Sequence, residues 1–288
     1  MSADGYIEVT GGQIWYRIVG DGDGVPLLLL HGGPGFPSEY LDPLGVLADE
    51  RPVVFYDQLG CGRSDRPNDA RLWRVDRFVE EVARVRETLS LSRVHIFGQS
   101  WGTMLAVDYA LTQPTGLASL ILASPALSIR KWMRDVRGLL SELPEDTLAM
   151  LDAHEREGFT NCPEYRAALI EFYRRYICRM RPWPTSLERS FAGASQAVYQ
   201  TMWGSTEFNV TGVLSTYERA DRLPEITVPT LFTCGRFDEA TPDATAWYHS
   251  LLPGSKIKVF EKSAHQAHLE ESTQYVQLVR AFLHESEK

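Results

Sequence analysis

The sequence predicts an α/β fold with a mostly parallel, doubly wound sheet and an inserted all-helical cap. Short apolar runs rich in Val, Ile, Leu and Phe alternate with longer helical patterns along most of the chain, which is typical of a sheet covered on both faces. Between about residues 126 and 212 the strand pattern disappears and only helical patterns remain. The chain has 288 residues, of which 44% are hydrophobic, so it can bury one large core with an inserted subdomain.

The apolar runs predict the strands of this sheet. We expect strands at residues 27–31, 53–57, 94–98, 120–124, 230–234 and 257–260. Residues 7–19 predict an antiparallel hairpin at the sheet edge, turned near Gly11 and Gly12. Helices are expected between the strands, for example at residues 75–89 and 101–112.

Residues 126–212, which we call the cap, predict helices alone. These are expected at residues 130–143, 145–157 and 164–180, the last two opened by Pro144 and Pro163. The core is then residues 1–125 and 213–288. An insertion between two strands lies over their carboxyl ends, where open α/β sheets bind ligands. The cap is therefore expected to cover a ligand site, and the alternative is a helical layer with no role in specificity.

Charge and cysteine usage narrow the class of protein. The net charge of −9 argues against a nucleic acid or an anionic membrane as partner. The first residues show neither a basic region nor an apolar region, and no apolar run is long enough to span a bilayer, so a soluble, cytoplasmic protein is expected. Free thiols are expected, without zinc or disulfides, because the cysteines are scattered. They are Cys61, Cys162, Cys178 and Cys234.

The stretch Gly98-Gln99-Ser100-Trp101-Gly102 follows a predicted strand and has the layout of a nucleophile elbow. In this motif a sharp turn from strand to helix holds the serine in a strained conformation, and small residues are required on either side of it. Ser100 Oγ is thus expected to stand exposed above the sheet as a nucleophile.

A serine hydroxyl is a weak nucleophile near neutral pH, so it needs a base and an acid that orients the base. In this architecture the acid and then the base follow the serine along the chain. Asp238 follows the strand that ends at Cys234, and His265 follows the last strand. His268 is the rival base, and we favour His265 because the loop directly after that strand is where the fold delivers this residue.

Two backbone N–H groups are expected to stabilise the oxyanion of the tetrahedral intermediate. One belongs to Trp101, the residue after the nucleophile. The other is assigned to Gly33, in the glycine-rich loop His31-Gly32-Gly33-Pro34-Gly35. His31 precedes Ser100 and so breaks the chain order expected of the base. We interpret it as a structural residue packed under this loop.

Together these motifs resemble the proline iminopeptidase family of α/β-hydrolases, over nearly the whole chain. In the cap, the resemblance is to the tricorn-interacting aminopeptidases. The core motifs are those at residues 31–35, 57–64, 98–102 and 235–238, and the cap motifs are those at residues 163–165, 183–184 and 202–208. One departure is Thr103, where the family often has glycine.

The resemblance implies release of the N-terminal residue from short peptides or amino-acid amides, with no metal and no cofactor. It also suggests a larger protease upstream as the source of the peptides. By position, the family's amine-binding carboxylates fall on Glu207 and Glu239. An ammonium in a water-poor cleft needs compensating charge, which agrees with this assignment. The alternative is that Glu207 caps a helix or pairs locally and Glu239 is a solvated loop carboxylate.

Three hypotheses for function remain at this point. The first is a serine aminopeptidase. The second is an esterase or amidase acting on a non-peptide acyl substrate, for example in secondary metabolism. The third is a non-catalytic relative, which the intact set of Ser100, Asp238 and His265 disfavours. The first-residue preference stays open, because the cap aromatics belong either to the pocket or to the cap core. They are Phe172, Tyr173, Tyr176, Phe191, Tyr199 and Trp203.

Overall fold

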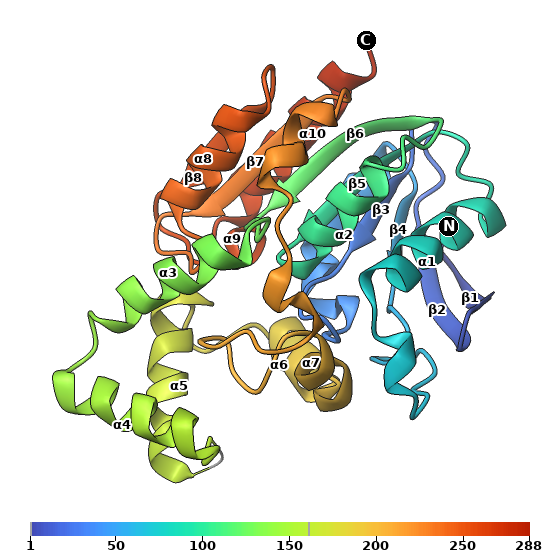
Figure 1. Cartoon of the computed structure of the whole chain (residues 1–288). Coiled ribbons are helices and arrows are strands. Elements are labelled where there is room, and N and C mark those ends of the chain that lie inside the picture. The colour runs from blue at the N-terminus through green and yellow to red at the C-terminus, as the bar shows by residue number, and fades with distance from the viewer. Residues whose placement is uncertain (1, 161) are drawn as a thin grey trace.

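A computed structural model describes residues 2–160 and 162–288. In this part of the chain one sheet of eight strands has the order β1-β2-β4-β3-β5-β6-β7-β8 (Figure 1). The strands are β1 (Ser2–Val9), β2 (Gly12–Val19), β3 (Leu27–Leu30), β4 (Val53–Tyr56), β5 (Val94–Gln99), β6 (Leu117–Ala123), β7 (Thr230–Gly235) and β8 (Lys256–Phe260).

The pairing of the strands confirms the predicted mostly parallel sheet. β1 and β2 form an antiparallel hairpin, and β2 pairs antiparallel with β4. From β3 to β8 every pairing is parallel. The carboxyl ends of these parallel strands therefore meet at one edge of the sheet, and the loops that follow them lie close together.

Two strands begin several residues earlier than predicted. β1 begins at Ser2, whereas the hairpin was predicted from residue 7, because most residues of this outer strand are exposed and lack an apolar pattern. β6 begins at Leu117 rather than at residue 120. Its early part includes Ser119, a buried polar residue whose hydroxyl shares a 2.7 Å hydrogen bond with Nδ1 of His95.

Helices cover both faces of the sheet (Figure 1). The α-helices are α1 (Val75–Thr88), α2 (Trp101–Ala110), α3 (Ile129–Leu140), α4 (Glu145–Glu157), α5 (Pro163–Tyr176), α6 (Thr185–Ala192), α7 (Gln196–Met202), α8 (Pro242–Leu251), α9 (Ala267–Glu270) and α10 (Ser272–Ser286). Short 3-10 helices are η1 (Ser38–Asp49), η2 (Ala70–Leu72), η3 (Val213–Thr216) and η4 (Ala220–Glu225).

The cap helices differ from the prediction in number and length. α6 and α7 were missed because they are only 8 and 7 residues long, too short to show a clear helical period. α5 ends at Tyr176 rather than at residue 180. Beyond this point the guanidinium of Arg181 donates hydrogen bonds to the carbonyl oxygens of Cys178 and Met180, so these groups take part in a loop instead of a helix.

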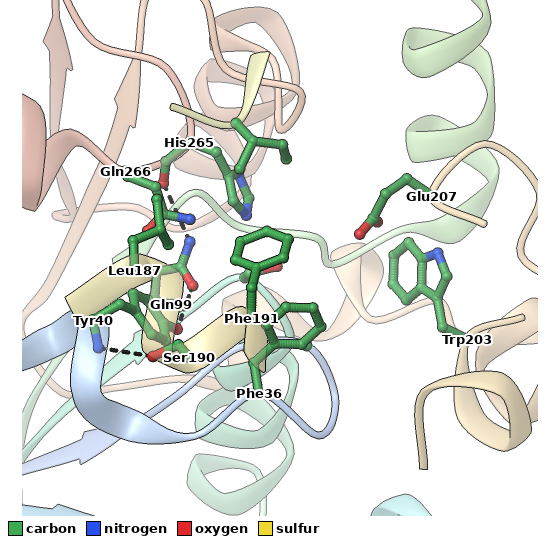
Figure 2. Close-up of a pocket in the computed structure, with 13 residues that line it drawn as sticks. Phe36, Tyr40, Gln99, Leu187, Ser190, Phe191, Trp203, Glu207, His265 and Gln266 are labelled. Carbon is green, nitrogen blue, oxygen red and sulfur yellow. Dashed lines mark hydrogen bonds between the residues drawn. The ribbon is translucent and has the colours of Figure 1, made fainter. Parts of the chain in front are cut away.

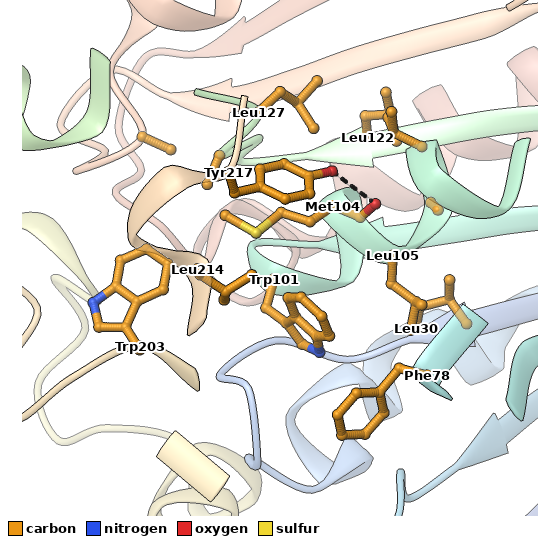
Figure 3. Packing of buried hydrophobic residues seen from close by; sticks show 14 of the residues in the cluster. Leu30, Phe78, Trp101, Met104, Leu105, Leu122, Leu127, Trp203, Leu214 and Tyr217 are labelled. Carbon is orange, nitrogen blue, oxygen red and sulfur yellow. Dashed lines mark hydrogen bonds between the residues drawn. The ribbon is translucent and has the colours of Figure 1, made fainter. Parts of the chain in front are cut away.

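Strand side chains alternate between two apolar clusters, as a pleated sheet requires. Leu28 and Leu30 of β3 join the cluster under α1 and α2, where the rings of Phe78 and Trp101 meet edge to face with their centroids 5.6 Å apart (Figure 3). Leu29 faces the opposite cluster, which contains residues of η1 and α10. The sheet is therefore a rigid platform for the loops at its carboxyl edge.

The cap contacts these loops directly. Ser195 N donates a 2.9 Å hydrogen bond to the carbonyl oxygen of Gly35, in the loop after β3. Ser190 Oγ accepts one of 3.1 Å from the backbone N–H of Tyr40. The cap is thus held against the edge where a ligand is expected to bind. In the described residues no helix is both long and apolar enough to cross a membrane.

Candidate active site

Ser100 lies at the sharp turn between β5 and α2, with φ 55° and ψ −121°. A Cβ atom on Gly98 would lie 2.2 Å from the carbonyl oxygen of Gly102, and one on Gly102 would lie 2.1 Å from that of Leu30. Both positions therefore exclude any side chain. Ser100 N donates a 2.9 Å hydrogen bond to Ala123 O on β6. The local geometry is that of the predicted nucleophile elbow.

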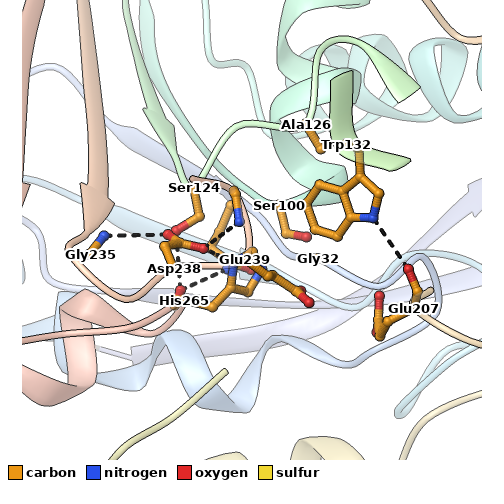
Figure 4. A network of polar contacts seen from close by, with 12 residues as sticks. Gly32, Ser100, Ser124, Ala126, Trp132, Glu207, Gly235, Asp238, Glu239 and His265 are labelled. Atoms are coloured by element: carbon orange, nitrogen blue, oxygen red, sulfur yellow. Dashed lines mark hydrogen bonds and ion pairs between the residues drawn. The ribbon is translucent and has the colours of Figure 1, made fainter. Parts of the chain in front are cut away.

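Asp238 and His265 come together from the loops after β7 and β8 (Figure 4). His265 Nδ1 lies 2.6 Å from Asp238 Oδ1. The same oxygen accepts a hydrogen bond from Ala240 N, and Oδ2 accepts one from Gly235 N. The buried carboxylate is thus fixed by the backbone, and it orients the imidazole as an acid does in a catalytic triad.

The backbone of His265 is held on three sides. Its carbonyl oxygen accepts hydrogen bonds of 3.2 Å from Gln99 Nε2 and Ser124 Oγ, and its N–H donates to Tyr176 O. Ser100 and His265 line the same pocket. Ser100 Oγ makes no hydrogen bond to any described residue. In enzymes without a bound substrate, the hydrogen bond between nucleophile and base is often long and tightens only when substrate binds.

Gly33 and Trp101 present their backbone N–H groups without an acceptor among the described residues. The neighbouring Gly32 N–H is occupied, because it donates to the hydroxyl of Tyr40 at 2.6 Å. Tyr40 in turn donates to Gln99 Oε1 at 2.7 Å. The loop is therefore fixed in a form that leaves Gly33 N–H as the available donor.

The other two histidines near the site have structural contacts. His31 is buried, and its Nε2 accepts a 2.9 Å hydrogen bond from Gln58 N; burial lowers its pKa. His268 Nε2 donates to the carbonyl oxygen of Tyr40 at 3.1 Å. Burial lowers the pKa of His268 to about 3. These contacts agree with a structural role for His31 and make His268 unsuited to act as the base.

Glu207 lies in the cap and lines the pocket that contains Ser100 and His265 (Figure 2). Its carbonyl oxygen accepts a 3.3 Å hydrogen bond from Trp132 Nε1. Burial raises the pKa of the Glu207 carboxyl group, and the Tyr199 hydroxyl and His265 act in the opposite direction. Among the described residues its carboxylate forms no ion pair with a Lys or Arg.

Glu239 is buried and not a solvated loop carboxylate, with 2% of its surface exposed. Its Oε1 lies 3.8 Å from His265 Nε2. Its Oε2 is buried without a hydrogen-bond partner in the described chain. Burial, followed by the charges of Glu207 and Asp238, raises its pKa well above the usual carboxyl value. Such a group is stabilised by an arriving cation with hydrogen-bond donors.

The pocket places Ser100, His265 and Glu207 beside an apolar wall and has a volume of about 50 Å³. Glu239 is not among the residues that line it. Of the cap aromatics, Phe191 and Trp203 line it, and the other four do not. Sequence reasoning missed several residues of the wall, all of which lie outside the quoted motifs except Gln99, a variable position of the elbow motif. They are Phe36, Tyr40, Gln99, Ile177, Leu187, Ser190 and Gln266.

Trp132 is a further residue that the sequence did not identify. Its ring meets that of His265 with centroids 6.4 Å apart, and that of Trp203 at 5.2 Å. Together with its hydrogen bond to Glu207, these contacts join α3 to the base and to the cap loop (Figure 4). In the described residues no three His, Cys, Asp or Glu side chains gather as metal ligands.

Comparison with known proteins agrees with this geometry. The family described as alpha/beta hydrolase fold matches residues 25–272, so the fold and the site define an α/β-hydrolase. A proline iminopeptidase of Heyndrickxia coagulans is 46% identical over 285 residues, covering 98% of this chain and 99% of that protein. This chain therefore belongs to the proline iminopeptidase family, as the motifs suggested.

Two solved structures extend the comparison. The crystal structure of a proline iminopeptidase from Mycobacterium smegmatis has a TM-score of 0.91 and 36% identity, covering 99% of this chain and 98% of that one. The crystal structure of VinJ has a TM-score of 0.95 and 36% identity, covering 98% of each chain. The likeness thus extends through both the core and the cap.

Proposed function

We propose that this protein is a serine aminopeptidase that releases N-terminal proline, or another small apolar residue, from short peptides and amino-acid amides. The observation that carries the proposal is the position of two buried carboxylates beside the reacting groups. Glu207 lines the pocket of Ser100 and His265, and Glu239 Oε1 lies 3.8 Å from His265 Nε2. No Lys or Arg lines this pocket. A protonated α-amino group supplies the missing positive charge and the hydrogen-bond donors.

The proposed reaction follows from the positions of the side chains. Ser100 Oγ attacks the carbonyl carbon of the first residue while His265 Nε2 accepts its proton, and Asp238 stabilises the imidazolium. Gly33 and Trp101 donate their N–H groups to the oxyanion. His265 then protonates the leaving amine, and water releases the acyl group by the reverse sequence of proton transfers.

The size of the pocket supports a small first residue. A volume of about 50 Å³ accommodates roughly four water-sized groups, which is comparable to a pyrrolidine ring. The wall is apolar, since Phe36, Ile177 and Leu187 face it. Named relatives of this chain are proline iminopeptidases, so an esterase or amidase acting on an unrelated acyl group is not favoured.

The proposal also covers the role of the cap, the source of the peptides and the location of the protein. Residues 126–212 act as a cap that admits short chains only, so a larger protease upstream is the proposed source of the peptides. The four cysteines are unpaired, which supports a location in the reducing cytoplasm. The direct test is hydrolysis of a prolyl chromogenic amide by the wild type, with Ser100→Ala as the blank.

A further inference from the structure

A second cavity lies in the cap beside the pocket of Ser100. Its volume is about 770 Å³, and α5 lines one side of it while α6 and α7 line the other. Phe36 and Phe191 belong to the walls of both cavities, and their rings meet edge to face with centroids 5.0 Å apart (Figure 2). The two cavities are therefore neighbours across this aromatic pair.

The charged side chains of the larger cavity are all positive. Only Arg66 and Arg166 are charged among the residues that line it, and neither forms an ion pair with another described residue. Arg66 donates a 2.8 Å hydrogen bond to the carbonyl oxygen of Gly193. The guanidinium of Arg166 makes no hydrogen bond within the described chain. Both arginines therefore keep their charge available to an anionic ligand.

Neutral groups complete the lining. Gln196 and Gln200 face the cavity from α7, and neither side-chain amide makes a hydrogen bond to another described residue. Each amide supplies both a donor and an acceptor, which is what the main chain of a peptide requires. Tyr165 and Tyr173 add aromatic surface from α5.

We propose that this cavity is a subsite for the leaving part of the peptide substrate, and that Arg66 and Arg166 bind its C-terminal carboxylate. The inference rests on the proposed function, because an aminopeptidase acting on short peptides always meets a free carboxylate after the scissile bond. Cavities of 300 to roughly 1,000 Å³ hold small organic ligands, so the leaving part is a few residues long.

The negative net charge of the protein explains why a positively charged subsite helps to bind the peptide. With a net charge of −9, the chain repels an anionic peptide at long range. Three carboxylates, those of Glu207, Asp238 and Glu239, already surround the reacting groups. The two arginines, in the cavity beyond Phe36 and Phe191, offset this repulsion. They orient the peptide with its ammonium toward Glu207 and its carboxylate toward Arg66 and Arg166.

The test compares three substrates: Pro-Gly-Gly with a free carboxylate, the same peptide as its C-terminal amide, and a prolyl chromogenic amide. We expect the wild type to prefer the free acid to the peptide amide by at least fivefold in kcat/KM. Arg166→Gln should abolish most of this preference and leave the chromogenic amide unchanged. Arg166→Glu should invert it. The preference of the wild type should also weaken with added salt.

Arg134→Gln is the matched control, because it removes the same charge from another cap helix. Arg134 lines a separate surface depression together with Arg130 and Lys131, so the acid-to-amide ratio should stay at the wild-type value. Equal kcat/KM for the acid and the amide in the wild type would overturn the subsite, as would a ratio that Arg166→Gln does not change. Failure of the wild type to cleave the chromogenic amide would instead reject the proposed function.

Discussion

Glu239 Oε1 lies 3.8 Å from Nε2 of His265, the nitrogen that accepts the Ser100 proton in the proposed reaction. Asp238, the preceding residue, contacts the other nitrogen of the same ring at 2.6 Å. Two consecutive carboxylates therefore meet opposite sides of one imidazole. Asp238 orients the base, while Glu239 lies on the side of the ring where the charge of Glu207 also raises its pKa. In the proposed function, these two glutamates attract the ammonium group of the substrate.

Glu207→Gln tests the role of this carboxylate in binding the amine. The variant keeps the size of the side chain and removes its charge, so the bound ammonium loses a partner. We expect a loss of about 3–5 kcal/mol, or several hundredfold or more in kcat/KM for free-amine substrates. Steady-state kinetics on a prolyl amide and on a neutral ester measure it. An equal loss on both substrates would reject the amine anchor.

The pH dependence of activity should report the two raised carboxyl pKa values. Glu207 and Glu239 are both shifted upward by burial, so they become neutral at a higher pH than ordinary carboxyl groups. As the pH falls through these values, the amine loses its counter-charge. The ratio of kcat/KM for a free-amine amide to that for a neutral ester should therefore decrease on the acid side. A ratio that is constant from pH 5 to pH 8 would contradict this.

Glu239→Gln should make the protein more stable and less active. Because the pKa of Glu239 is raised in the folded state, the folded protein binds this proton more tightly than the unfolded chain. Stability is then lost as the pH rises from the unfolded value toward the folded one. The variant removes the buried negative charge that destabilises the folded protein at high pH. We expect its free energy of unfolding to be about 1 kcal/mol higher than that of the wild type at pH 8, and equal to it near pH 4. Urea unfolding at both pH values measures it.

Gly102→Ala should prevent the elbow from forming correctly. The added Cβ would lie 2.1 Å from the carbonyl oxygen of Leu30, so strand and helix have to move apart. We expect a loss of about 3 kcal/mol in the free energy of unfolding, together with loss of activity. Gly138→Ala is the matched control in α3: no atom lies within 4 Å of its Cβ, and it should gain about 0.5–1 kcal/mol. Similar stability of the two variants would refute the steric argument.

Tyr40→Phe tests whether the loop of Gly33 is held in place by its neighbour. The variant removes the hydroxyl that accepts from Gly32 N and donates to Gln99 Oε1. The oxyanion donor is then less well placed, and kcat should fall about tenfold or more. Because the amine anchors are untouched, KM should change little. A change in KM without a change in kcat would contradict this prediction, because it would show that Tyr40 acts on substrate binding instead.

The sequence predicted those parts of the site that depend on local patterns. The turn around Ser100 is encoded by its two flanking glycines, and Asp238 and His265 follow apolar strands whose ends the sheet brings together. Glu207 and Glu239 were identified only through the resemblance to a family, because a single carboxylate in a loop has no distinctive pattern. The structure showed that both are buried, that Glu207 lines the pocket of Ser100 and that Glu239 lies beside His265.

What the sequence did not predict depends on contacts between distant segments. Tyr40 and Gln99 are 59 positions apart and share a hydrogen bond, and Trp132 reaches Glu207 across 75 positions. The helices α6 and α7 were missed for a related reason. Short helices have little stability of their own, and these are held by packing on η1 and the loops of the core.

The most direct measurement is hydrolysis of paired prolyl and alanyl chromogenic amides, each with a free and an acetylated amino group, with Ser100→Ala as the blank. The account predicts cleavage of the free-amine members alone, with proline preferred. Equal cleavage of the free and acetylated members would contradict it, because Glu207 and Glu239 would then not select the substrate by its ammonium group.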